Sequence, residues 1–394
     1  MRRFALLLLA ACSSSTSSTE QGISEAVKRE RLALIRDSAA EMGVYNAALL
    51  AGIAKSETEL AHCFSEAGFA CPGPASPSCG GDEIIAGGAD GPCSAMQGGL
   101  GMFQFDAGTF AETLATYGDS ILTIEGNTAQ AVAFVVDKII LDIDGVNEWR
   151  AATAWMNSVP LVAGDPLTEA WAKLVACRYN GCCSTSTTCT TRARGYRDNA
   201  ITLYNEMGAD FWRTANRCSA VPDGGIIDQR SACYTAGGEP RYWRREASGY
   251  ADSREWTNST SAAAPSNFAI WKIASAGTYR LEVHISGGEA TAAKYEVRHA
   301  GTTDVITIDQ TTADGFVSLG DFTFSGDGDE YVLLGDNTGT RDQKLVFDAL
   351  RVVSPDDEGG GGCGCRTASP PTAAFALLLL ASISRRRRRQ TTAR

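Results

Sequence analysis

The apolar positions of this chain follow two different periods, one in each half. Up to about residue 212, apolar residues recur every three or four positions, which is the spacing of an amphipathic helix. Ser24 is a typical N-cap residue and predicts a helix that runs through Ser38. Further helices are predicted at residues 45–60, 129–143 and 167–178.

From Gly224 onward, short segments alternate or run apolar between glycine-rich turns, as strands do. Strands are predicted at residues 279–285, 294–298, 305–309 and 331–334. Strands of this length fit a two-sheet, jelly-roll-like domain. At 394 residues the chain is long enough for several domains. We therefore predict a multidomain protein in which a mainly α domain is followed by an all-β sandwich.

One carboxylate interrupts the apolar pattern of the second predicted helix. Leu50, Ile53, Ala54 and Glu57 share one helical stripe, whereas Glu59 lies about 200° round the helix and is expected to face water. A carboxyl group beside an apolar wall has its charged form disfavoured, which is how a glycosidase keeps a proton available near neutral pH. The alternative is a half-buried glutamate in a salt bridge.

Three segments in order resemble the motifs of soluble lytic transglycosylases and goose-type lysozymes. They are Ile53–Leu60, Gly101-Met102-Phe103-Gln104 and Tyr179-Asn180-Gly181, within a resemblance that covers residues 28–212. The resemblance implies a lysozyme-like domain with Glu57 as catalytic acid and base. It also implies substrate contacts from Gly101, Met102, Gln104, Tyr179 and Asn180.

The chain departs from that family in two places. From Glu57 to Gly101 it runs 44 residues, and this stretch contains Cys63, Cys71, Cys79 and Cys93. We interpret residues 61–98 as an insertion pinned by disulfides. The tyrosine segment lacks one residue of the family pattern and is followed by further cysteines, Cys182, Cys183 and Cys189.

The resemblance implies cleavage of the β-1,4 bond between N-acetylmuramic acid and N-acetylglucosamine in peptidoglycan. Glu57 would protonate the glycosidic oxygen while the 2-acetamido group of the substrate supports the developing cation. The same carboxylate would then accept a proton from the 6-hydroxyl or from water, giving an anhydro or a hydrolysed product. No cofactor is required. An inverting hydrolase would need a second carboxylate, for which Asp82, Glu83 and Asp90 are available.

Two other functions remain open at this stage. A family 19-type chitinase also places a catalytic Glu before a Gly-x-x-Gln segment, but a second acidic motif is not evident here. A non-catalytic adhesin could have kept a lysozyme-like scaffold for glycan binding alone. Glycan affinity without turnover would distinguish the adhesin from an enzyme.

The second half resembles the golvesin C-terminal-like, or Xly carbohydrate-binding-like, domain over residues 225–353. The resemblance rests on Trp271 with Ala276–Tyr279, and on segments 308–311, 319–322 and 347–353. It implies an accessory module of secreted enzymes that binds glycan. Three tryptophans, Trp243, Trp256 and Trp271, could stack on sugar rings, although a Trp in a β-sandwich is more often part of the core.

Both ends of the chain look like export signals. A basic start, an apolar stretch and Leu9-Ala10-Ala11-Cys12 form a lipobox, which predicts lipidation of Cys12. At the other end, Cys363-Gly364-Cys365, an apolar run and five arginines resemble a myxobacterial-type sorting signal. The apolar run is shorter than the roughly 20 residues of a membrane-spanning helix. We expect an exported lipoprotein of the outer membrane or cell surface, held by one or both ends, or a secreted protein.

Cysteine use and charge agree with export. Of 13 cysteines, one is assigned to lipid and two to sorting, which leaves ten for five disulfides of unknown connectivity. A metal site is not predicted, because the three histidines are dispersed and Cys182 and Cys183 are adjacent.

Removing residues 1–11 and 366–394 takes away nine arginines and no acid, so the formal charge falls from −11 to −20. This charge argues against nucleic acid as a partner.

These observations divide the chain into six parts. They are a lipoprotein signal peptide with its lipobox at 1–12, a Ser/Thr-rich tether at 13–23, a lysozyme-like domain at 24–217, a linker at 218–224, the golvesin-like sandwich at 225–353, and the Gly/Cys linker with the sorting signal at 354–394.

Overall fold

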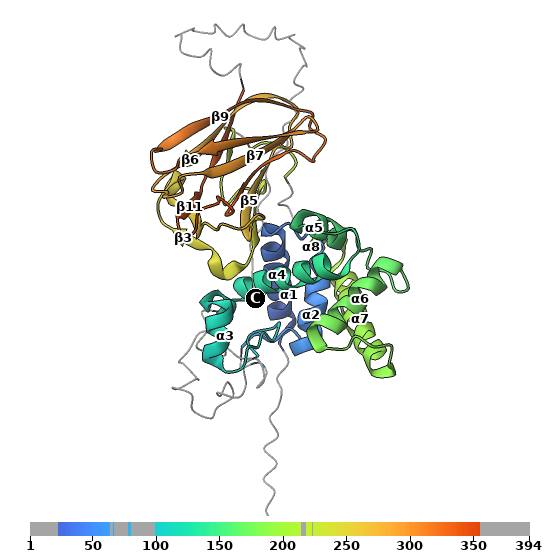
Figure 1. Cartoon of the computed structure of the whole chain (residues 1–394). Coiled ribbons are helices and arrows are strands. Elements are labelled where there is room, and N and C mark those ends of the chain that lie inside the picture. Colours follow the sequence, from blue (N-terminus) through green and yellow to red (C-terminus); the bar gives the residue numbers. More distant parts are fainter. Residues whose placement is uncertain are drawn as a thin grey trace, which may run out of the picture. The chain divides into compact units, whose positions relative to one another are not determined.

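The computed structural model describes residues 23–63, 66, 78–79, 99–213, 218–222 and 224–354. Helices occupy the first part of this range and antiparallel strands the second (Figure 1). The predicted order of a mainly α region and a β-sandwich is therefore confirmed. The signals that contain Cys12, Cys363 and Cys365 lie outside the described residues, as does most of the insertion at 61–98. Within the described ranges, no helix combines the length and apolar character needed to cross a membrane.

Within the residues that the structure describes, the helical part contains four α-helices that were predicted and four that were not. All eight are α1 (Glu25–Glu41), α2 (Ala48–Thr58), α3 (Phe110–Tyr117), α4 (Ile124–Asp142), α5 (Trp149–Ser158), α6 (Pro166–Asn180), α7 (Thr187–Met207) and α8 (Ala209–Trp212). Ser24 caps α1 as expected, since its side chain accepts a hydrogen bond from the Val27 amide at 3.3 Å. Helices α3, α5, α7 and α8 were not predicted.

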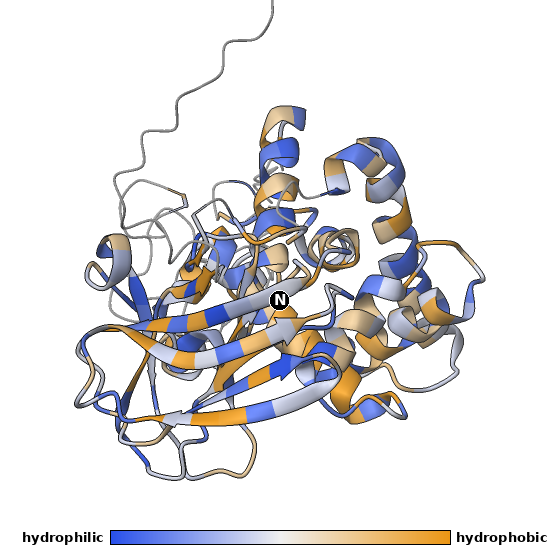
Figure 2. Cartoon of the chain, turned by 90° about the horizontal axis from the view of Figure 1, so that it is seen from above, coloured by the Kyte–Doolittle hydropathy of each residue, from blue (hydrophilic) through white to orange (hydrophobic). Residues whose placement is uncertain are grey.

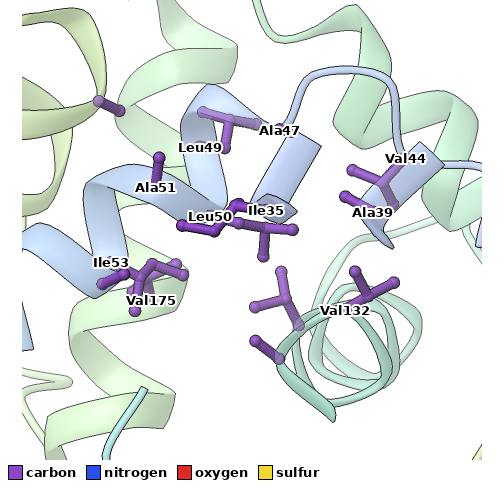
Figure 3. Packing of buried hydrophobic residues seen from close by; sticks show 14 of the residues in the cluster. Ile35, Ala39, Val44, Ala47, Leu49, Leu50, Ala51, Ile53, Val132 and Val175 are labelled. Carbon is purple, nitrogen blue, oxygen red and sulfur yellow. The ribbon is translucent and has the colours of Figure 1, made fainter. Parts of the chain in front are cut away.

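Helix α2 is the centre of the helical core. Its residues from Ala48 to Ala54 are all buried, as expected for a helix that is apolar on every side. Figure 3 shows Leu50 beside Ile35 of α1, and Ile53 beside Val175 of α6. The helix is thus fixed by neighbours around its circumference, and its C-terminal turn carries Glu57 to the boundary of the core.

Two small residues allow α2 and α7 to pack unusually closely. A Cβ atom added to Gly52 would lie 2.6 Å from the Ala200 side chain and 2.7 Å from its backbone nitrogen. No larger residue fits without moving one of the helices. One turn along this antiparallel contact, the Asn199 amide donates to the Ser56 hydroxyl at 2.9 Å. These contacts therefore fix the position of α7 along the axis of α2.

A buried ion pair anchors the chain where it leaves α2. Arg31 on α1 is 4% exposed, pairs with Glu66, and donates to the Leu60 carbonyl at 2.7 Å. Glu66 also accepts the amides of His62 and Cys63, each at 2.9 Å. A disulfide joins Cys63 to Cys79 in the same segment. The beginning of the insertion is thus held by charge, hydrogen bonds and a covalent bridge.

The β part consists of antiparallel sheets with the strand orders β1-β12-β6-β9, β2-β5-β10-β7-β8 and β11-β4-β3. The strands are β1 (Ile226–Ile227), β2 (Tyr234–Gly238), β3 (Arg244–Glu246), β4 (Arg254–Asn258), β5 (Asn267–Lys272), β6 (Gly277–Ile285), β7 (Ala293–His299), β8 (Thr302–Ile308), β9 (Gly315–Phe324), β10 (Tyr331–Gly335), β11 (Lys344–Phe347) and β12 (Leu350–Val353). Hydrophobic and hydrophilic residues alternate along the strands (Figure 2). On β6, Leu281, Val283 and Ile285 are buried, and the residues between them are more exposed. The four strands predicted from the alternation correspond to β6, β7, β8 and β10.

The three tryptophans of the sandwich differ in their surroundings. Trp271 is 1% exposed and donates its indole N–H to the Asp348 carbonyl at 3.1 Å, so it is a core residue. Trp243 is half-buried, packs on Phe347 with ring centroids 4.8 Å apart, and donates to a backbone carbonyl. Trp256 is also partly exposed, with the Lys344 ammonium 5.0 Å from its ring centroid. Stacking on a sugar is excluded for Trp271 in this conformation.

The Gly52 contact predicts an unusual result for a glycine in a helix. Gly52→Ala gains about 1 kcal/mol of helix propensity but must separate two backbones, so we expect a net loss of about 1–3 kcal/mol in unfolding free energy. Gly195→Ala is the matched control, because a Cβ at Gly195 in α7 would meet nothing within 4 Å. Urea unfolding of both variants measures the difference. Equal effects of the two substitutions would show that the contact is not tight.

Burial of His62 predicts a pH-dependent stability. His62 is fully buried, and this burial lowers its pKa from 6.5 to about 4. Between pH 6.5 and 4 the unfolded chain binds the proton more readily, so stability should fall as the pH falls through this window, by up to about 3 kcal/mol. Denaturant unfolding at pH 7 and pH 4.5 tests this expectation. His62→Gln should flatten the pH dependence, and an unchanged slope would contradict the assignment.

Candidate active site

Two helices, α6 and α7, bring polar groups to one oxygen of Glu57, which α2 carries. Glu57 is half-buried near the C-terminal end of α2. Its Oε1 accepts a short hydrogen bond from the Tyr196 hydroxyl of α7. The same oxygen accepts from the Asn180 side-chain amide of α6 at 3.3 Å, and Asn180 also donates to the Tyr196 hydroxyl. The other carboxylate oxygen, Oε2, has no hydrogen-bond partner among the described residues.

Tyr196 is the partner of Glu57 that the sequence interpretation missed. Burial and the nearby Glu57 charge raise the pKa of the Tyr196 phenol far above its usual range, so it stays protonated and donates. Its helix is held by a buried stripe of Ala193, Tyr196, Ala200 and Leu203. The helical spacing of these four residues could have predicted α7 from the sequence, although threonine and arginine dominate the rest of the segment.

Tyr179 bonds to the backbone of the neighbouring loop. The resemblance implies a substrate contact for this residue, which stays a prediction, and its hydroxyl donates to the Phe103 carbonyl at 2.6 Å. Its ring packs edge-on against Phe134 with centroids 5.2 Å apart. Burial raises the Tyr179 pKa well above 10, which keeps the hydroxyl a donor. Tyr179 therefore holds the loop at 99–105 and makes no hydrogen bond to Glu57 among the described residues.

The loop is a tight hairpin built around a buried asparagine. Leu100 and Phe105 pair through two backbone hydrogen bonds of 2.8 and 3.2 Å. Asn127 of α4 is fully buried, accepts from the Phe103 amide at 3.0 Å and donates to the Leu100 carbonyl at 3.1 Å. Gly101 has a φ of 66°, and its missing Cβ leaves room for Asn127, which would lie 2.6 Å away. The glycine thus serves the packing of the loop.

The predicted substrate-binding residues of this loop separate into two groups. Gly101 and Met102 are buried, and the Met102 carbonyl accepts from Thr58 of α2 at 3.2 Å. Both lie in the core in this conformation, and their expected contact with substrate stays a prediction. Gln104 remains half-exposed and folds back to donate to the Gly101 carbonyl at 2.9 Å. The predicted site residues that keep some exposure are Glu57, Gln104, Tyr179 and Asn180.

Two disulfides bracket the turn that carries Asn180. Cys177 pairs with Cys183, and Cys182 pairs with Cys189, so the two adjacent cysteines belong to different bridges. A further bridge joins Cys218 to Cys233. With Cys63–Cys79, these bridges confirm a disulfide framework, and Cys71 and Cys93 lie outside the described residues. The turn between α6 and α7 is therefore covalently closed on both sides of Gly181.

The described part of the site offers a carboxylate that can exchange a proton. No group of three or more His, Cys, Asp or Glu residues suited to a metal ion occurs in the ranges that the structure describes. The candidate second carboxylates, Asp82, Glu83 and Asp90, fall outside those ranges. What the geometry provides is one carboxylate with one oxygen fixed by donors and the other oxygen unbonded.

The sandwich carries a partly exposed ring cluster beside a buried acid. Asp348 is 2% exposed and bonds His284 Nδ1 at 2.7 Å. The His284 ring contacts Phe316 and Tyr250 with centroids 5.0 and 5.9 Å apart. The Arg351 guanidinium lies 4.0 Å from the centroid of the Phe316 ring. Rings and guanidinium groups on one sheet are the kinds of group that contact sugars.

Comparison with known families identifies the sandwich. Residues 226–354 match the Golvesin C-terminal domain. The match confirms the resemblance predicted for residues 225–353. It covers about one third of the chain, so it concerns this domain alone.

Comparisons with whole proteins add little to this result. A solved structure of a xanthan lyase from Paenibacillus is 20% identical over 33% of this chain, with a TM-score of 0.29. The matched region spans only 13% of that lyase. No curated protein matches the chain.

The Tyr179 hydrogen bond predicts a local loosening when it is removed. Tyr179→Phe should leave the Phe103 carbonyl without its buried donor, at a cost of about 1–2 kcal/mol in unfolding free energy. Hydrogen exchange should accelerate in residues 99–105 more than in α4. Tyr204→Phe on α7 is the control. Uniform acceleration in both variants would mean that Tyr179 does not hold the loop specifically.

Proposed function

We propose that this protein is a cell-surface lytic transglycosylase or muramidase that cleaves the β-1,4 bond between N-acetylmuramic acid and N-acetylglucosamine. The observation that carries the proposal is the hydrogen bonding of Glu57. Oε1 is fixed by Tyr196 and Asn180, and Oε2 has no hydrogen-bond partner in the part of the chain that the structure describes. A carboxyl group held at one oxygen and open at the other is arranged to exchange a proton with a ligand.

The reaction can be run by Glu57 as a single acid and base. In the first step its Oε2–H gives a proton to the glycosidic oxygen, and the bond to the anomeric carbon breaks. The 2-acetamido group of the substrate attacks this carbon, so no protein nucleophile is consumed. In the second step the Glu57 carboxylate accepts a proton from the 6-hydroxyl or from water as the new bond forms.

Tyr196 and Asn180 would act in the second half of this cycle. Both donate to Oε1, so they stabilise the carboxylate that Glu57 becomes after it has released its proton. They also hold the side chain in one rotamer, so that Oε2 keeps its direction toward the substrate. They are positioning residues, and the proton that reacts belongs to Glu57.

The sandwich, the disulfides and the predicted signals support an extracellular location for this chemistry. A Golvesin C-terminal domain at 226–354 supports glycan interaction by an accessory module. The disulfides in the described residues support an oxidising compartment. We propose that Cys12 is lipidated and that the Cys363–Cys365 segment is read by a sorting system, which leaves the protein at the outer membrane or cell surface.

A glycan-binding adhesin is the second candidate function. The observation in its favour is the matched sandwich domain together with its partly exposed rings at Tyr250 and Phe316. The helical part would then supply a second binding surface without turnover. The two functions differ in one measurable result, which is the appearance of cleaved products.

Mass spectrometry of soluble products tests the enzyme proposal. The oxidised protein is incubated with purified peptidoglycan, beside the Glu57→Gln and Tyr196→Phe variants. Glu57→Gln should abolish products, whereas Tyr196→Phe should lower kcat by about tenfold or more with KM little changed. Anhydro products identify a transglycosylase, and reducing ends identify a lysozyme. Full activity in Glu57→Gln would refute the assignment, and glycan binding with no products from any protein would favour the adhesin.

A further inference from the structure

A polar groove runs beside the catalytic carboxylate. It has a volume of about 570 Å³ and lies between the end of α2 and one face of α7. Its lining residues are Ser56, Glu59, Thr187, Thr188, Thr191, Arg192, Gly195 and Asn199. Ser56 directly precedes Glu57, and Asn199 is bonded to Ser56 at 2.9 Å. The groove is therefore a neighbour of the candidate active site, and Glu57 is not part of its lining.

The floor of this groove contains a glycine that the fold does not need. Gly195 lies inside the 21-residue helix α7, where glycine costs about 1 kcal/mol relative to alanine. A Cβ at this position would meet nothing within 4 Å, unlike the Cβ of Gly52, which would strike Ala200. Packing therefore explains Gly52 and leaves Gly195 unexplained. Close approach of a ligand to the helix backbone is the physical role that remains.

Arg192 supplies the charge of the groove. It is exposed and makes no ion pair with any carboxylate among the described residues, although the chain carries a formal charge of −11. The other charged residue of the lining is Glu59, and its carboxylate lies 3.7 Å from the Lys55 ammonium. Arg192 also lies one turn before Tyr196, and its charge opposes the rise in the Tyr196 pKa, which places it near the Glu57 network. A guanidinium without a partner favours a ligand carboxylate.

The groove residues of α7 lie on one face of the helix. Thr188, Arg192, Gly195 and Asn199 are spaced by four, three and four positions. A ligand could thus run along the helix with its backbone over Gly195 and its charge at Arg192. The hydroxyls of Thr187, Thr188 and Thr191 would offer hydrogen bonds on the same side.

We propose that this groove binds a carboxylate-bearing portion of the glycan strand, through Arg192 and across the bare backbone at Gly195. The inference rests on the proposed function and names the part of the substrate that the site reads. Carboxylates of this kind come from the stem peptide of peptidoglycan or from the lactyl ether of its muramyl residues. A neutral amino-sugar polymer such as chitin has neither.

Binding measured without turnover tests the groove. The oxidised full chain is prepared as Glu57→Gln, and Arg192→Gln or Gly195→Leu is added to it. Calorimetry gives Kd for three soluble probes: strands with intact stem peptides, amidase-treated strands that keep only lactyl carboxylates, and chitohexaose. Both added substitutions should weaken binding of carboxylate-bearing strands by about tenfold and leave chitohexaose unchanged. Thermal unfolding checks that Gly195→Leu has not lowered stability, and Arg192→Gln carries the test if it has.

The outcomes separate the groove from the enzyme proposal. Loss of affinity for peptide strands alone assigns the stem peptide as the ligand of Arg192, loss for amidase-treated strands alone assigns the free lactyl carboxylate, and loss for both shows that Arg192 binds either carboxylate. Equal weakening for chitohexaose, or no weakening at all, would overturn the inference even if the protein cleaves peptidoglycan. Carboxylate-dependent binding with no cleavage by the unmodified chain would keep the groove and reject the enzyme.

Discussion

The close contact of Gly52 with Ala200 is the constraint on which the candidate site depends. Helices that meet through a glycine and an alanine approach nearer than helices with larger residues between them, so the next turn of each lies within hydrogen-bonding reach of the other. Tyr196 reaches Glu57, and Asn199 reaches Ser56, because of this proximity. The chemistry of the carboxylate is thus a consequence of helix packing several residues away from it.

Sequence patterns predicted the scaffold better than the partners. The apolar stripe of α2 predicted that Glu57 continues the inward face of the helix and that Glu59 faces water; Glu57 is half-buried and Glu59 is exposed. Helix α7 was missed because its buried stripe is only four residues, including Ala193 and Ala200, within a polar segment. Tyr196 was missed with it. A hydrogen bond across 139 residues of sequence depends on tertiary packing, which no local pattern encodes.

The loop at 99–105 shows why a motif can indicate a site and still mislead about roles. Its glycine, methionine and glutamine match a family motif, yet Gly101 makes room for Asn127 and Met102 lies in the core. Tyr179 then fixes the loop through the Phe103 carbonyl. Tyr179 and Asn127 therefore hold the loop in its conformation. The strands and the Golvesin domain were easier to predict, since alternation is a local property of each strand.

The doubly bridged turn between α6 and α7 makes the site dependent on redox chemistry. Asn180 lies between the cysteines of one bridge, and Tyr196 lies farther along on α7. The two bridges join cysteines that are six and seven positions apart. Each bridge stabilises the fold by about 2 kcal/mol, because it lowers the conformational entropy of the unfolded chain. In a reducing compartment that contribution is absent, so the turn that positions Asn180 beside Glu57 is less stable there. The carboxylate would therefore be held by both of its partners most firmly where thiols are oxidised.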